Sequence, residues 1–293
     1  MNDHISHLDI GGARVTRVEE MAGPAFRLST LFPDWDESIF EAHKDWLVPH
    51  YVNPEKMTAL LNMHSWVLQM GGLTVLIDTC IGNDKNRMPA ERWHQNQSPY
   101  LERLAEAGFR PDDIDVVMCT HLHVDHVGWN TQLRDGRWVP TFPNAKYVFS
   151  RTEFEHFQAN AEDMDRHSFE DSVLPIVEQG RAEMTDGAHA LADGLLLEPA
   201  PGHTPGHITL TMETGSEAAI FTGDILHHPL QIYYPDWNSR FCILADEART
   251  SRRRVLDFCV DRGALLMPAH FGPPHCCHID RAGEAYAARW HHG

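Results

Sequence analysis

The chain has 293 residues, of which 42% are hydrophobic and 23% are charged, and its formal net charge is −18. This composition supports a sizeable core and argues against a disordered chain. So strong a negative charge also argues against binding to nucleic-acid phosphates, which requires clustered Lys and Arg. We therefore expect the partner to be a small-molecule substrate and not a nucleic acid.

The N-terminal residues contain no basic segment followed by an apolar one, so we expect no signal peptide. No apolar run approaches the roughly 20 residues of a membrane helix, so we expect no membrane partner. Six cysteines are scattered along the chain, and we interpret them as reduced thiols. These features predict a cytoplasmic protein.

The first half of the chain begins with strand-like runs at residues 7–20, 64–70 and 73–78, and Gly71-Gly72 predicts a hairpin between the last two. Residues 24–60, rich in aromatics and prolines, are predicted to be an excursion that could cover a pocket; a plain surface loop with a short helix is the alternative. A helix is expected over 99–108 and a strand over 114–120. A strand at 146–150 and helices at 152–160 and 169–180 follow.

The second half continues with predicted strands at 195–200, 207–213 and 218–224. A helix over 246–261 precedes a strand at 264–270, and a last helix is expected over 280–291. Strands and helices alternate in both halves, which indicates an α/β protein with sheet packed on sheet and helices outside. We predict a single domain spanning 1–293.

One segment is unusually rich in metal-binding side chains. His121, His123, Asp125 and His126 lie within six residues, directly after the strand predicted at 114–120. Imidazoles at i and i+2 on an irregular loop can reach one ion, and the next two side chains can turn towards a second. Imidazole and carboxylate suit zinc and related metals.

Three later side chains of the same kind follow predicted strands: His203, Asp224 and His270. Each lies on a turn that contains Gly or Pro, and loops at strand ends are where α/β proteins place their sites. With the first cluster, these residues would give two ions about four protein ligands each if Asp224 bridges them.

This order of residues resembles the metallo-β-lactamase superfamily, whose fingerprint is HxHxDH followed by separate His, Asp and His ligands. The resemblance extends from about residue 60 to residue 272 and implies a four-layer αβ/βα sandwich. It implies a first metal on His121, His123 and His203, a second on Asp125, His126 and His270, and Asp224 as the bridge. It also implies that Asp78 orients a ligand histidine. Two divalent ions are expected, zinc first, with manganese, cobalt or iron as alternatives.

Within this superfamily the chain is most similar to the branch of N-acyl-homoserine lactonases and organophosphate hydrolases such as methyl parathion hydrolase. The lactonases place a tyrosine three residues after the bridging Asp, where this chain has His227. We predict that His227 is catalytic and donates a hydrogen bond to the substrate carbonyl; a supporting role behind the ligands is the alternative. Tyr233 and Tyr234 are possible substitutes. Asp125 is the candidate proton shuttle, with metal ligation as its only role as the alternative.

The predicted activity is hydrolysis of a small, partly apolar ester or lactone by hydroxide generated at two metals. A phosphotriester hydrolase and a thioesterase like glyoxalase II are the alternatives, and a non-haem iron redox enzyme is a more distant one. As a set, the aromatic residues near the ligands in sequence favour an uncharged substrate, although for each one we expect packing in the core ahead of contact with substrate: Trp129, Phe271, Tyr233, Tyr234, Trp237, Phe32 and Trp35. The aromatic excursion is also compatible with a homodimer.

Two further groups of residues have more than one interpretation. His275-Cys276-Cys277-His278 resembles a zinc motif, but its spacing is wrong for one ion, and we expect His275 and Cys276 to line the rim of the site. Lys85 and Arg87 could meet a substrate carboxylate, with a solvated loop as the alternative.

Overall fold

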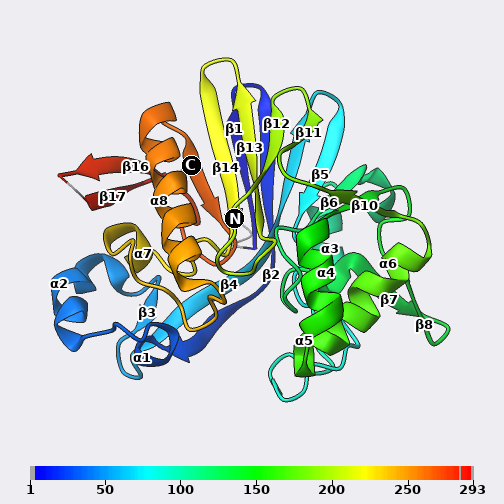
Figure 1. Ribbon diagram of the computed structural model, residues 1–293, viewed down its shortest axis with the longest axis horizontal. Coiled ribbons are helices and arrows are strands. Elements are labelled where there is room, and N and C mark those ends of the chain that lie inside the picture. The colour runs from blue at the N-terminus through cyan, green and yellow to red at the C-terminus, as the bar shows by residue number, and fades with distance from the viewer. Residues whose placement is uncertain (1–3, 284, 292–293) are drawn as a thin grey trace.

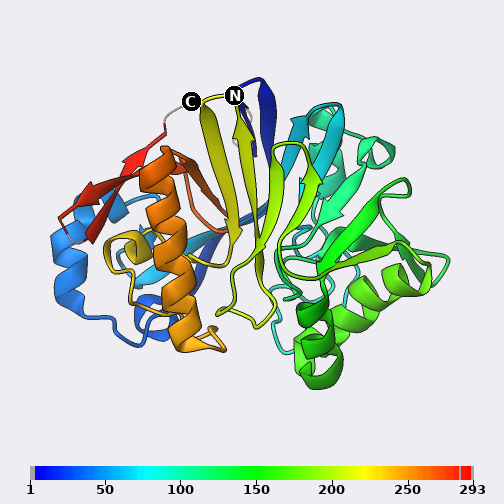
Figure 2. The ribbon, with the colours of Figure 1, turned by 45° about the horizontal axis from the view of Figure 1, so that its top comes forward.

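The computed structural model describes residues 4–283 and 285–291. Two β-sheets face each other at the centre of the molecule, and helices cover the outer face of each sheet (Figures 1 and 2). The predicted four-layer α/β sandwich is therefore confirmed.

The first sheet has eight strands in the order β1-β2-β4-β5-β6-β9-β10, with β3 paired to β4. Strands β4 and β5 form the predicted hairpin, with Met70 opposite Leu73. The strands of this sheet are β1 (Ile5–Ile10), β2 (Ala13–Arg27), β3 (Val52–Asn53), β4 (Thr58–Met70), β5 (Leu73–Ile77), β6 (Val116–Met118), β9 (Lys146–Ser150) and β10 (Ala182–Thr185).

The second sheet has seven strands that follow chain order from β11 to β17. They are β11 (His189–Ala192), β12 (Leu195–Pro199), β13 (Ile208–Thr214), β14 (Glu217–Gly223), β15 (Leu265–Pro268), β16 (Cys277–Ala282) and β17 (Ala285–Trp290). Strands β14 and β15 are parallel, and helix α8 (Ala245–Arg262) connects them across the outer face. A separate hairpin consists of β7 (Thr131–Arg134) and β8 (Arg137–Pro140).

The remaining helices pack outside the two sheets. They are α1 (Leu28–Leu31), α2 (Glu37–Leu47), α3 (Tyr100–Glu106), α4 (Arg151–Asn160), α5 (Asp163–Ser168), α6 (Leu174–Glu178) and α7 (Leu230–Tyr233), with a π-helical turn η3 (Phe169–Val173) and 3-10 turns η1 (Pro111–Asp113) and η2 (Gly128–Asn130). The helices predicted at 99–108, 152–160 and 246–261 correspond to α3, α4 and α8.

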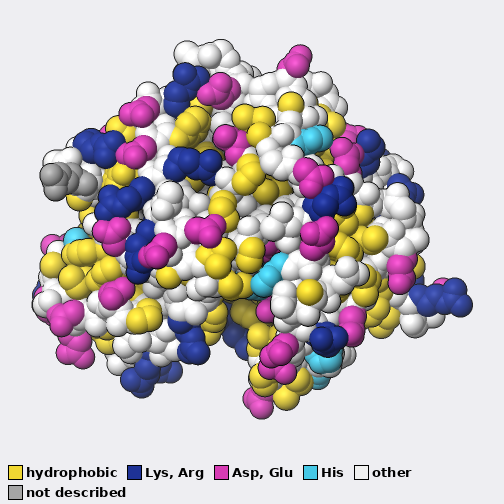
Figure 3. All heavy atoms as spheres, viewed as in Figure 1, with side chains coloured by type: hydrophobic (Ala, Val, Ile, Leu, Met, Phe, Trp, Pro, Cys, Tyr) yellow, Lys and Arg dark blue, Asp and Glu magenta, His cyan; other side chains and the backbone are white. Residues whose placement is uncertain are grey.

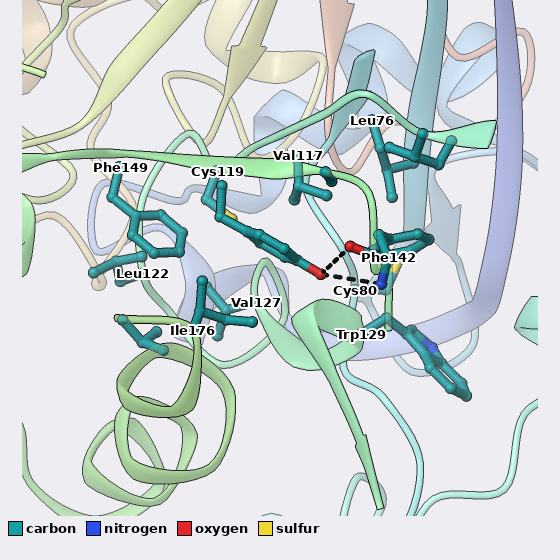
Figure 4. Packing of buried hydrophobic residues seen from close by; sticks show 14 of the residues in the cluster. Leu76, Cys80, Val117, Cys119, Leu122, Val127, Trp129, Phe142, Phe149 and Ile176 are labelled. Carbon is teal, nitrogen blue, oxygen red and sulfur yellow. Dashed lines mark hydrogen bonds between the residues drawn. The ribbon is translucent and has the colours of Figure 1, made fainter. Parts of the chain in front are cut away.

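Separate apolar clusters hold these layers together. Val15, Leu68, Leu210 and Phe221 belong to the cluster between the two sheets. A second cluster joins the outer face of the first sheet to α3, α4 and α6, and Figure 4 shows part of it. In this view Leu122 points into the core beside Phe149. The loop that follows β6 is thus anchored by an apolar side chain.

Residues 24–60 are only partly the excursion that their sequence suggests. Strand β2 continues to Arg27 and pairs with β4, with Pro24 opposite Leu60. Helices α1 and α2 follow, and their apolar side chains join an aromatic cluster with α7. This cluster contains Phe32 and Tyr51, both fully or nearly fully buried.

The helix predicted over 280–291 is wrong. Of the described residues in this range, 280–282 belong to β16 and 285–290 to β17, and residue 284 lies outside the described residues. The two strands pair with each other from Cys277 opposite Trp290 onwards. Alanine and arginine favour helix, but Cys277 and Ile279 are buried at a spacing of two residues, and sheet pairing overrides a weak local preference.

Within the described residues, no helix is long and apolar enough to cross a bilayer. Figure 3 shows acidic and basic side chains interspersed over one face of the molecule. That face therefore presents no broad basic surface of the kind that nucleic acid requires.

Candidate metal centre

The loop after β6 carries the first four of the seven predicted metal ligands, which we call metal-type side chains. Leu122 and Val127 are buried in the core beneath the loop, so the side chains between them turn the other way. The amide of Thr120 donates to Asp78 Oδ1 over 2.7 Å, which fixes the start of the loop. His121 and His126 are each only 1% exposed.

Three histidines from two loops meet at one point. The ring nitrogens Nε2 of His121, Nδ1 of His123 and Nε2 of His203 lie 3.0, 2.8 and 3.1 Å apart in a triangle. A ring nitrogen carries either a proton or a lone pair, so these three contacts cannot all be hydrogen bonds. Three lone pairs directed at one cation satisfy the arrangement, and the donor set suits zinc.

A second group lies on the other side of Asp224. Nε2 of His126 and Nε2 of His270 are each 3.7 Å from an oxygen of Asp125. The same two nitrogens lie 3.3 and 3.0 Å from Oδ1 of Asp224. The other oxygen of Asp224, Oδ2, is 3.3 Å from Nε2 of His203. One carboxylate thus presents an oxygen to each group, as a bridging ligand must.

Neighbouring groups hold the Nδ1 atoms of two of the rings, so that their Nε2 atoms face the centre. Nδ1 of His126 is 2.8 Å from Asp78 Oδ2, and Nδ1 of His270 is 2.8 Å from the carbonyl oxygen of Asn62. Such partners fix the orientation of metal-ligating imidazoles. In the part of the chain that the structure describes, Nε2 of His126 and Oδ1 of Asp224 are buried without a hydrogen-bond partner. The residues therefore fit a pair of metal ions.

The electrostatics of the cluster agree with this interpretation. Burial and the rings of His126 and His203 hold the pKa of His121 well below its ordinary value. Against the effect of burial, the carboxylates of Asp224 and Asp78 raise the pKa of His126 well above its ordinary value. A proton on His126 would balance these carboxylates, and a bound cation would displace it, because metal ligation requires neutral imidazole.

His227 lies at the edge of the cluster, three residues after Asp224 as the sequence requires. Its Nε2 is 3.3 Å from Asp224 Oδ2 and 3.4 Å from Ser239 Oγ. Burial lowers its pKa, so the neutral ring can donate a hydrogen bond. The two tyrosines considered as substitutes lie elsewhere: Tyr234 bonds to His43 through its hydroxyl, and Tyr233 stacks on Trp46.

A cavity of about 450 Å³ opens above the cluster. His123, Asp125, His203, Asp224, His227 and His270 form its floor. The walls are mostly apolar and come from six separate segments: Ala25, Phe26, Leu31, Leu61, Met63, Ala90, Arg92, Trp93, Val124, Met164, Asp165 and Phe241.

The aromatic residues that the sequence suggested for this pocket do not line it. Trp129 stacks on Tyr100 in the core, Phe271 is fully buried, and Trp237 stacks on Tyr234. Phe26, Trp93 and Phe241 form the wall instead. No motif marks these three, because Phe26 lies at the end of β2 and the other two lie in turns, and their approach to the ligands depends on the whole fold.

Both interpretations of Lys85 and Arg87 are wrong. The two side chains are fully buried, and both pair with Asp171, with Arg87 Nη1 2.7 Å from Oδ2. His275 and Cys276 are also buried and do not line the cavity; the His275 ring packs against His64 instead. All six cysteines are free thiols.

The chain matches the family model of the metallo-beta-lactamase superfamily over residues 60–270. An N-acyl homoserine lactonase of Bacillus thuringiensis is 29% identical over 117 residues, which is 40% of this chain and 40% of that protein. A second such lactonase, from Agrobacterium fabrum, is 31% identical over 106 residues, 32% of this chain and 37% of its own. The matched region thus spans well under two thirds of these relatives.

Two solved structures resemble the chain over nearly their whole length. AidC, a dizinc quorum-quenching lactonase in complex with a product, gives a TM-score of 0.82 at 18% identity and covers 100% of this chain and 99% of its own. The hydrolase AbOPH of the beta-lactamase superfamily gives 0.83 at 21% identity with the same coverage. At these identities the likeness concerns the fold. Because the family match includes all seven metal-type positions and well over half of the sequence, the chain belongs to the metallo-beta-lactamase superfamily.

Proposed function

We propose that this protein is a hydrolase that depends on two divalent metal ions and cleaves the ester bond of a small, partly apolar ester or lactone. One observation carries the proposal. Two groups of metal-type side chains lie on either side of Asp224, and members of both groups form the floor of a cavity with apolar walls. Such a cavity with a few convergent polar groups is typical of a small-molecule site.

The proposed ligands divide into two sets that share one carboxylate. His121, His123 and His203 would hold one ion, Asp125, His126 and His270 the other, and Asp224 both. Nitrogen and carboxylate donors in this number suit zinc, and manganese, cobalt and iron can use the same donors. A dizinc centre is what AidC is described as having, and we expect zinc here.

When bound, two such ions supply Lewis acidity and hydroxide at neutral pH. The chain itself orients the reacting groups. Nε2 of His227 lies at the floor of the cavity, where it can donate a hydrogen bond to the substrate oxygen as negative charge develops on it. Asp125, whose side chain is 14% exposed, faces the same space and can carry a proton to the leaving alkoxide.

The walls favour an acyl group of moderate length. Phe26 and Phe241 lie with their ring centroids 5.0 Å apart, and Leu61 and Met63 continue the apolar surface. The relatives in Bacillus and Agrobacterium are named N-acyl homoserine lactonases, and AidC was solved with an acyl-homoserine product. An N-acyl lactone is therefore the first substrate to test.

The test pairs metal content with initial rates. We expect about two zinc ions per chain and a higher kcat/KM on an N-hexanoyl lactone than on a p-nitrophenyl ester, a phosphotriester or a thioester. A dominant rate on the phosphotriester or the thioester would agree with the proposed metal centre but would show that the proposed substrate class is wrong. A chain that holds a single iron and hydrolyses none of the four would overturn the proposal.

A further inference from the structure

Glu153 is a buried carboxylate that the proposed chemistry does not use. It is the third residue of α4, and it is only 1% exposed. Ser150, which caps the helix, accepts a hydrogen bond from the Glu153 amide. An acidic side chain in the first turn of a helix is favoured by the helix dipole. That preference alone does not explain burial, because a buried carboxylate needs hydrogen-bond donors.

The donors come from two different loops. Oε1 of Glu153 accepts from the amide of Leu122 over 3.1 Å, and Oε2 accepts from the amide of Gly206 over 2.9 Å. Leu122 lies between His121 and His123, and Gly206 lies in the turn that carries His203. Among the described residues, Glu153 is the side chain that hydrogen-bonds to the backbone of both loops.

The turn at Gly206 also packs directly on the backbone of α4. A Cβ atom at Gly206 would lie 2.1 Å from the Glu153 nitrogen and 2.5 Å from its Cα. No other residue fits this approach without moving the helix or the turn. The distance between the two histidine loops is thus set at α4, by one carboxylate and one close backbone contact.

We propose that Glu153 is a positioning residue that holds the three-histidine group together and thereby sets the affinity of one of the two metal positions. The inference rests on the proposed metal-dependent function. The other group is held by different contacts, Asp78 to His126 and the Asn62 carbonyl to His270. A change at Glu153 should therefore weaken one position and spare the other.

The test compares Glu153→Gln with the wild-type full-length chain. Glutamine keeps the size of the side chain but has one accepting oxygen, so one of the two backbone amides loses its partner. Zinc binding is followed by calorimetric titration, and the occupancy of each position by anomalous diffraction. We expect affinity at the three-histidine position to fall about 10- to 100-fold, and affinity at the other position to change less than about threefold.

Two further variants serve as controls. Glu155→Gln removes the same charge from an exposed position of the same helix and should leave both affinities unchanged. Asp78→Asn should give its larger loss at the position that includes His126, with a smaller loss at the three-histidine position because Asp78 also accepts from the Thr120 amide. Glu153→Asp keeps the charge and shortens the side chain by one methylene group. It should reproduce the selective loss if the glutamine variant does not fold.

Equal losses at both positions, or wild-type affinities in the Glu153 variants, would overturn the positioning role. Wild-type protein that binds fewer than two zinc ions would instead overturn the proposed function itself. The two failures are therefore distinguishable.

Discussion

The floor and the walls of the cavity are built in different ways. The floor consists of side chains that follow the ends of strands β6, β12, β14 and β15, and Asp78 and the Asn62 carbonyl hold the Nδ1 atoms of His126 and His270. The walls consist mostly of apolar side chains from six segments spread between residues 25 and 241. The proposed metal ligands are thus placed at strand ends, whereas the walls combine side chains of strands, helices and loops that lie far apart in the sequence. The two regions should respond differently to mutation.

The largest effect is expected at the centre of the floor. Asp224→Ala removes the one carboxylate that faces both groups, with its two oxygens 3.0 Å from His270 and 3.3 Å from His203. We expect zinc content below two per chain and a fall in kcat/KM of about 10³-fold, since about 4 kcal/mol of metal-dependent stabilisation is lost. Metal analysis and initial rates measure both. An unchanged zinc content of two would contradict the bridging role.

The next largest effect is expected at His227, where a substitution should slow the chemical step without removing metal. His227→Phe removes the proposed donor and should lower kcat about 100-fold while zinc stays at two per chain. Tyr234→Phe is the control, because its hydroxyl bonds to His43 away from the cavity, and its kcat should match the wild type. Loss of zinc in the His227 variant would make that residue a ligand instead, which its distance to Asp224 also allows.

Substitutions in the walls should weaken substrate binding and leave the chemical step unchanged. Phe26→Ala removes one side of the apolar surface, and KM for an N-hexanoyl lactone should rise about tenfold, since contact with about two methylene groups is worth about 1.6 kcal/mol. kcat should change little. Phe40→Ala, in the same segment but outside the cavity, is the matched control. Equal effects of the two substitutions would show that residues 24–60 act on stability and not on substrate fit.

The smallest effect on turnover is expected at His228, which lies outside the cavity and should instead make the stability of the fold depend on pH. This buried ring accepts from the Leu230 amide and donates to the Tyr51 carbonyl, and burial lowers its pKa to about 4. In the unfolded chain the His228 ring binds a proton at about pH 6.5, its ordinary pKa. The folded protein therefore keeps its full stability above that pH and loses stability as the pH falls from 6.5 towards 4. We compare metal-free wild type with metal-free His228→Gln. Between pH 7.5 and 5 the free energy of unfolding of the wild type should fall about 2 kcal/mol more than that of the variant. Identical pH profiles would contradict this.

The same contrast explains what could be predicted from the sequence. The spacing of His121, His123, Asp125 and His126 after a β-branched strand is local, and a position at a strand end is a local property too. Local patterns also predicted α8 and the β4–β5 hairpin. All seven metal-type side chains therefore meet in the structure, and Asp78 lies where the resemblance places it.

What the sequence did not predict depends on distant contacts. Lys85 and Arg87 look like exposed loop residues until Asp171, more than 80 residues later, pairs with both inside the core. The final strands were predicted to be a helix because the pairing of β16 with β15, and of β17 with β16, is not visible in their composition. Phe26 and Phe241 are separated by more than 200 residues, and only the folded chain brings their rings together.

The central claim is that seven side chains hold two ions with Asp224 between them. Anomalous diffraction at the zinc absorption edge, on crystals grown with zinc, tests it most directly. We predict two peaks about 3.5–4 Å apart, one beside His121, His123 and His203 and the other beside Asp125, His126 and His270. A single peak, or a pair of peaks that do not share Asp224, would contradict the account.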